Sequence, residues 1–209
     1  MNINQFKGDN ESKYPPLGAG TYGAVCSGVI DIGTHITEWN GEQKTRNQLI
    51  LMFDLPDETI EVDGKKMPRC LSLKLTKSKH ENSTLRKHLI AWRGRDFTDE
   101  ELNDFSLSKL LGVPVTIGVV QKEYKGKRYA NISTLGKAIK GTDLKATRKI
   151  YFDMKDPDSF GAIDDLPKWI VKLINESAES IADNRVFEKG KTPEHTEHVD
   201  DATDDDCPF

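Results

Sequence analysis

The chain has 209 residues, of which 36% are hydrophobic and 31% charged, and its formal net charge is −4. This length allows one sizeable domain with appendages or two small domains. No apolar run is long enough for a membrane helix, the N-terminus lacks the apolar segment of a signal peptide, and the three cysteines form no Cys-x-x-Cys pair. We therefore expect a soluble cytoplasmic protein that has no membrane contact, no cofactor and no bound metal.

The charge is distributed unevenly along the chain. Residues 194–209 contain seven of the 34 acidic residues and none of the 30 basic ones, so the rest of the chain has a net charge of about +3. A mildly basic body followed by an acidic tail suits a protein whose body binds a polyanion.

The composition divides the chain into four segments. Residues 1–20 are polar and contain several Gly and Pro residues, which predicts a flexible N-terminal arm. Residues 21–140 have the patterns of a folded domain, and residues 141–185 predict an extension with one helix. Residues 186–209 predict a disordered acidic tail.

Three strands are predicted in the first half of the domain. Residues 21–33 are rich in small and β-branched side chains, residues 49–55 alternate Leu and Phe with other residues, and residues 67–76 alternate Leu with polar residues. The polar residues 34–48 are predicted to form a connection with a turn at Trp39-Asn40-Gly41.

Helical patterns follow, and then two more strands. Residues 81–93 have apolar side chains at helical spacing, and Thr98 with Glu101 has the spacing of a capping box at the start of a second helical segment. Residues 113–120 and 127–135 are predicted to be strands joined by a turn.

The order β-β-β-α-β-β is that of the oligonucleotide-binding (OB) barrel. We therefore expect a mainly β fold with helical insertions: a five-stranded OB-type barrel, a C-terminal helix over residues 166–182 and the disordered acidic tail. The helix has an apolar stripe that includes Ile170, Ile174 and Ile181. It would either cover one side of the barrel or mediate self-association, for which a dimer is the expected form.

Residues 18–25 match the glycine-rich loop of protein kinases letter for letter. The other kinase motifs are missing from the sequence, and a predicted strand rather than a helix follows the glycines. We interpret these glycines as the entry into a bent first strand.

Aromatic and basic residues occur together in several predicted strands and turns. An OB barrel binds a single strand by stacking bases on aromatic rings while Lys and Arg contact the phosphates. The alternative for each residue is a solvated turn or local packing, and Trp92 is expected in the core. The candidates for binding single-stranded DNA are Trp39, Lys44, Arg46, Lys65, Lys66, Arg69, Lys74, Lys77, Lys79, Arg93, Arg95, Tyr124, Lys125, Lys127, Arg128 and Tyr129.

The acidic tail contains Asp204, Asp205, Asp206, Cys207, Pro208 and Phe209. This run resembles the acidic C-terminal tip of bacterial single-stranded DNA-binding proteins, with Cys207 where that family usually has Ile. The resemblance implies docking on replication or recombination proteins, with the Phe209 ring in an apolar pocket and the acids on a basic rim. The alternative is a solvated tail that only aids solubility.

A second resemblance lies in the helical region, in residues 83–86, 91–94 and 110–112. These stretches are similar to phage-encoded single-stranded DNA-binding proteins. The likeness implies a phage or prophage protein in a bacterial host, which recruits host enzymes through the tail.

The expected function is sequence-independent binding and protection of single-stranded DNA in replication, recombination or repair. The alternatives are an adaptor or inhibitor that does not bind DNA and a strand-annealing recombination protein. No catalytic constellation is evident, so we do not expect an enzyme. A metal-dependent nuclease site at Asp153, Asp156 and Asp158 is the alternative to a plain acidic loop.

Overall fold

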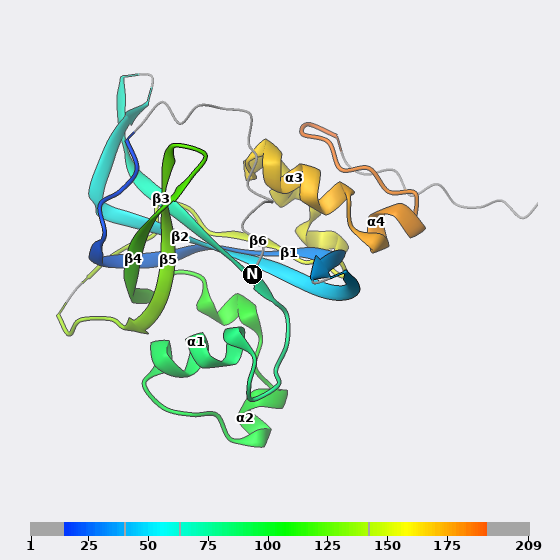
Figure 1. The fold of residues 1–209 in the computed structure, drawn as a ribbon, viewed down its shortest axis with the longest axis horizontal. Helices are drawn as coiled ribbons and strands as arrows, with labels where there is room; N and C mark the ends of the chain where they lie inside the picture. Colours follow the sequence, from blue (N-terminus) through cyan, green and yellow to red (C-terminus); the bar gives the residue numbers. More distant parts are fainter. Residues whose placement is uncertain (1–14, 40, 63, 142, 192–209) are drawn as a thin grey trace, which may run out of the picture.

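The computed structural model describes residues 15–39, 41–62, 64–141 and 143–191, so the expected arm and tail lie almost entirely outside it. The described chain forms a mainly β fold around one open sheet (Figure 1), as the sequence predicts at this level. The order of its elements is β1 (Gly20–Trp39), β2 (Glu42–Val62), β3 (Lys65–Thr76), α1 (Thr84–Arg93), α2 (Asp99–Asn103), η1 (Leu107–Leu110), β4 (Pro114–Tyr124), β5 (Lys127–Lys137), β6 (Ile150–Phe152), η2 (Pro157–Asp165), α3 (Lys168–Asn175) and α4 (Ala178–Ala182).

The sheet has the strand order β3-β2-β1-β4-β5, with antiparallel pairing throughout this path. The long β1 pairs with β4 through its first residues and with β2 through the rest. The short β6, which the sequence patterns did not predict, pairs with β1 in parallel. Among the described residues no ladder joins β3 to β5, so the sheet is open at these two edges.

The β1–β2 hairpin is longer than the sequence predicts. Residues 34–48 form a paired ribbon up to Trp39 and Glu42 instead of a polar connection. Backbone pairing needs no apolar face, and both faces of this ribbon carry polar side chains, so apolar alternation could not reveal it. The predicted turn is correct: Gly41 adopts φ 76°, a left-handed conformation that favours glycine.

The middle of β1 and β2 is buried on both faces. Leu49, Leu51 and Phe53 point into one core, together with the apolar side chains of α1, β4 and β5. Ile50 and Met52 alternate with them and point into a second core. The sequence predicts the first core but not the second, because the second exists only where residues 150–187 cover the sheet.

The helical insertion between β3 and β4 is broken into short pieces. Ser83 caps α1 by accepting a hydrogen bond from the Arg86 amide at 3.1 Å. The predicted core residue Trp92 of α1 is buried against β4, and its Nε1 donates to the Pro114 carbonyl at 2.8 Å. The predicted capping box of Thr98 and Glu101 is present at the start of α2. The second helical segment ends at Asn103 rather than continuing, and η1 follows it.

The expected helix over 166–182 is two shorter helices, α3 and α4. The break falls at Ser177, whose Oγ accepts from the Ser180 amide at 3.1 Å and so starts a new helix. Ile170 and Ile174 are buried against the sheet, whereas Ile181 is 69% exposed because α4 turns it away from the expected stripe. No helix in the described residues is both long and apolar enough to cross a membrane.

The segment that leads to β6 is tied to the sheet by the buried carboxylate of Asp54. Asp54 accepts a hydrogen bond from Ser27 Oγ at 2.8 Å, and from Thr147 Oγ1 at 2.7 Å on its other oxygen. Each carboxylate oxygen therefore accepts a hydrogen bond, as a buried carboxylate requires. This contact brings the chain after β5 back across the sheet.

Candidate nucleic-acid interface

The β4–β5 hairpin presents two aromatic and two basic side chains on one face. The cross-strand pairs are Lys122 with Tyr129 and Tyr124 with Lys127. Directly opposite residues in an antiparallel pair share a face, and successive residues alternate, so all four side chains lie on the same side. Tyr124 is 39% and Tyr129 40% exposed, which leaves ring surface available for stacking. We call these four residues the Tyr/Lys face.

The opposite face of this hairpin has a different character. Arg128 is the cross-strand partner of the acidic residue Glu123 there. Lys125 is in the two-residue turn, with its Nζ 5.4 Å from the ring centroid of Tyr124. The register thus places Tyr124, Lys127 and Tyr129 together and Arg128 apart. Lys122 is not among the residues predicted from the sequence, because the predicted strand ends at residue 120 whereas β4 continues to Tyr124.

The β1–β2 hairpin carries other predicted residues. Arg46 and Lys44 share one face with His35 and Thr37, their cross-strand partners, and Lys44 forms an ion pair with Glu42 at 3.1 Å. The side chain of Trp39 lies outside the described part of the structure. This hairpin and the β4–β5 hairpin lie at opposite ends of β1, which has 20 residues (Figure 1).

The β2–β3 hairpin holds Lys65 and Lys66, both exposed near its turn. Arg69 is directed to the segment before β1, where its Nη1 donates to the Pro15 carbonyl at 2.8 Å. Lys74 lies near the end of β3 and is half-buried, and burial lowers the pKa of its ammonium group. Lys65 and Lys66 are therefore better placed for phosphate contact than Arg69 or Lys74.

Lys77 and Lys79 follow β3. Lys77 Nζ is 2.5 Å from Asp31 Oδ2 and 3.8 Å from Asp153 Oδ2, so it links the exit of β3 to β1 and to the end of β6. Lys79 is exposed, and its Nζ is 3.4 Å from the Asn103 carbonyl. Of the two, Lys79 is accessible to a phosphate and Lys77 has a structural role.

Arg93 and Arg95 both bind the carboxylate of Glu101. Arg93 Nη1 donates to one oxygen at 2.8 Å, Arg95 Nη2 donates to the other at 2.6 Å, and the Arg93 guanidinium also lies 4.5 Å from the ring centroid of Phe97. These hydrogen bonds hold the pKa of Glu101 well below its usual range. The structure thus pairs two predicted phosphate-binding residues with an acid.

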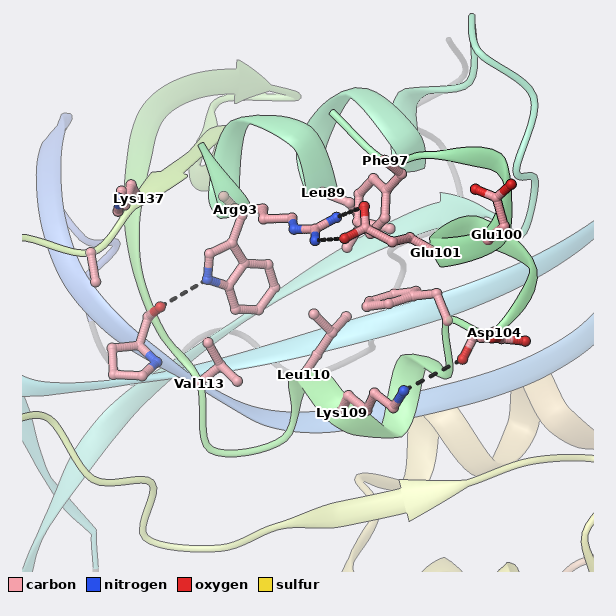
Figure 2. Close-up of a pocket in the computed structure, with 14 residues that line it drawn as sticks. Leu89, Arg93, Phe97, Glu100, Glu101, Asp104, Lys109, Leu110, Val113 and Lys137 are labelled. Carbon is pink, nitrogen blue, oxygen red and sulfur yellow. Dashed lines mark hydrogen bonds and ion pairs between the residues drawn. The ribbon is translucent and has the colours of Figure 1, made fainter. Parts of the chain in front are cut away.

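A cavity with a volume of about 810 Å³ lies among α1, α2 and η1 (Figure 2). Its interior is apolar, with Leu89, Phe97 and Leu110 among its walls. Its rim holds both acidic and basic side chains, and Figure 2 shows Lys109, whose Nζ donates to the backbone carbonyl of Asp104 at 3.4 Å. Such a mixed rim has no preference for a polyanion.

The acidic residues after β6 act in local structure. Asp153 Oδ1 accepts from the Lys155 amide at 3.0 Å, and Asp156 caps η2 by accepting from the Asp158 amide at 3.2 Å. In the described ranges no group of three or more His, Cys, Asp or Glu side chains is placed to hold a metal ion.

The sequence matches no protein family model and no curated protein.

Proposed function

We propose that this protein binds single-stranded DNA without sequence preference in replication or recombination, as its sequence resemblance implies. The observation that carries the proposal is the Tyr/Lys face of the β4–β5 hairpin. Alternating rings and ammonium groups suit a single strand, because rings stack on any base and ammonium groups attract the phosphates between bases. Stacking contributes about 1–3 kcal/mol per base.

The strand order supports an OB-type barrel as the scaffold. The path β3-β2-β1-β4-β5, with a long β1 shared by two neighbours and helices inserted between β3 and β4, is compatible with the connectivity of such a barrel. Register shifts between Cys26 and Gly28 and between Asp31 and Gly33 mark irregularities of the kind that bend a strand. Residues of β3 and β5 also approach each other, as closure would require.

The acidic segment Asp204–Phe209 is proposed to recruit replication or recombination enzymes, and it lies outside the described residues. Its aromatic side chain would occupy an apolar pocket of the partner, and its carboxylates would contact a basic rim. An adaptor that does not bind DNA is the competing function. It would need this segment but no Tyr/Lys face.

A binding experiment tests the proposal. Full-length protein is titrated into fluorescent oligo-dT and into a matched duplex at low and moderate salt. We expect preference for the single strand, with affinity that falls as salt rises. Replacing both Tyr124 and Tyr129 by Ala removes two stacking platforms and should weaken oligo-dT binding by about tenfold or more.

Two variants in the same hairpin serve as a matched pair. Lys122→Gln removes a charge from the Tyr/Lys face and should weaken binding and reduce its salt dependence, whereas Arg128→Gln removes a charge from the opposite face and should have a smaller effect. Absence of oligo-dT binding by the wild-type protein would favour the adaptor. Equal losses in the two variants would contradict the assignment of this face.

A further inference from the structure

A second cavity, of about 480 Å³, lies between α1 and the sheet at the exit of β3. This volume is within the range of about 300–1,000 Å³ that is typical of small-molecule sites. Its floor is apolar and includes Leu49, Leu89 and the ring of Phe105. The cavity therefore offers a flat aromatic group a dry surface.

Besides Lys77, three cations from different elements line the same cavity. Lys79 follows β3, Arg86 belongs to α1 and Lys155 follows β6. Lys79 and Lys155 are exposed, and Arg86 is held toward Asp96 by a contact of 3.4 Å. The two acids that line the cavity, Asp31 and Asp153, both face Lys77, so the charge left for a ligand is positive.

One wall of the cavity carries both a hydrogen-bond donor and a hydrogen-bond acceptor. Lys77 Nζ is close to Asp31, but its distance to Asp153 Oδ2 is 3.8 Å. The Tyr151 hydroxyl donates to the same oxygen over a long 3.4 Å. Asp153 Oδ2 can therefore accept a shorter hydrogen bond from a ligand, beside an ammonium group that can donate one. An acyl chain would offer neither a donor to Asp153 nor an acceptor to Lys77.

We propose that this cavity binds one nucleotide, with its base on the apolar floor and its phosphate at Lys79, Arg86 and Lys155. The base presents an exocyclic amino group to Asp153 and a ring acceptor to Lys77, a combination that cytosine and adenine possess and thymine lacks. The proposal deepens the proposed function and rests on it for the source of the nucleotide, a bound strand. The hairpin would stack bases of any sequence, and this cavity would add one position that prefers bases with an exocyclic amino group.

The test is an NMR titration of ¹⁵N-labelled full-length protein with dCMP, dTMP and inorganic phosphate. We expect dCMP to perturb the amides around Leu89 and Phe105 and to bind about fivefold or more tightly than dTMP, with phosphate weaker still. Asp153→Asn exchanges a pure acceptor for an amide that also donates, so the preference for dCMP should fall to within about twofold.

A matched pair of double variants controls for net charge. Lys79→Gln with Lys155→Gln should weaken dCMP binding about fivefold or more, whereas Lys87→Gln with Lys172→Gln, exposed lysines outside the cavity, should change it less than about twofold. Displacement of dCMP by oligo-dC identifies the strand as the source, and retention of dCMP identifies the free nucleotide. Either result supports the cavity.

The proposal is overturned if dCMP perturbs no cavity residue, if phosphate alone binds as tightly, or if both double variants behave alike. This failure is separable from that of the proposed function. Oligo-dT binding that is lost in the Tyr124→Ala and Tyr129→Ala protein reports on the hairpin whether or not dCMP binds.

Discussion

The carboxylate of Glu101 makes several hydrogen bonds and ion pairs in the helical insertion. Its side chain accepts a hydrogen bond from the Thr98 amide at 3.1 Å to complete the capping box, and it also binds Arg93 and Arg95. The charged form of this one carboxylate therefore orders the start of α2 and joins it to the end of α1.

The low pKa of Glu101 makes the free energy of unfolding depend on pH in the acidic range. Because folding lowers this pKa, the ionised side chain contributes stability above its unfolded value of about 4.3, and the contribution is lost as pH falls below that value. We expect Glu101→Gln to flatten the decline of the free energy of unfolding between about pH 5 and pH 2. Urea denaturation at several pH values measures this, with Glu81→Gln at an exposed position as the control. Parallel acid limbs for wild type and Glu101→Gln would contradict the assignment.

Sequence reasoning reached the cap but not the ion pairs. Thr98 and Glu101 are three residues apart, and that spacing alone specifies a capping box. The sequence at Arg93 and Arg95 is the same whether these residues bind a phosphate or a carboxylate. The turn at Gly94, with φ 81°, brings both guanidinium groups to Glu101. The ligand of a basic residue is thus decided by backbone geometry that local spacing does not encode.

At the scale of elements, hairpins were predicted better by their turns than by their strands. The β4–β5 turn consists of Lys125 and Gly126, with φ of 51° and 73°, as a two-residue turn requires. The requirement for positive φ favours Gly and a few other residues, so a turn of this kind can be recognised in the sequence. The polar ribbon of residues 34–48 has no apolar alternation and was not recognised as paired strand. The break between α3 and α4 was missed because Ser177 is compatible with a helix interior and becomes a cap only in context.

Lys125 occupies a left-handed conformation that costs a non-glycine residue about 1–2 kcal/mol, whereas Asn tolerates it better. We expect Lys125→Asn to stabilise the hairpin by about 0.5–1 kcal/mol. Slower hydrogen exchange of the amides in residues 122–129 would show this. Lys125→Val, which is β-branched, should accelerate the same exchange; slower exchange in that variant would refute the conformational explanation.

At the scale of the whole molecule, the sheet is the shared wall of two cores. Ile50 and Met52 on one side and Leu49 and Leu51 on the other belong to the same strand, so unfolding of either core removes support from the other. The run of apolar residues in β2 shows that both faces are covered. It does not reveal that β6 and α3 provide the second cover, because their contacts with the sheet are remote in sequence.

Phe187 tests this coupling. It is 1% exposed and packs edge-to-face on Phe152 and Phe160, with ring centroids 5.4 and 5.0 Å away. We expect Phe187→Ala to lower the free energy of unfolding by about 3–5 kcal/mol. The exposed neighbour Val186 is the control, and Val186→Ala should change it by about 0.5 kcal/mol or less.

Hydrogen exchange measured under mild denaturant would locate the effect of Phe187→Ala. Faster exchange is expected in α1 as well as in α3, since the two helices belong to two cores that share β1 and β2. Faster exchange confined to residues 150–191 would show that the second core unfolds on its own.

In the described residues, the glycine at the turn of each of the three β-hairpins has open space around it. A side chain added at Gly41, Gly64 or Gly126 would meet no other atom within 4 Å. A short peptide tag or a reporter group could therefore be inserted at these three turns without disturbing either core. The 20 residues of β1 separate the turn at Gly41 from the turn at Gly126. Reporters at these two turns would therefore follow the two ends of β1 independently.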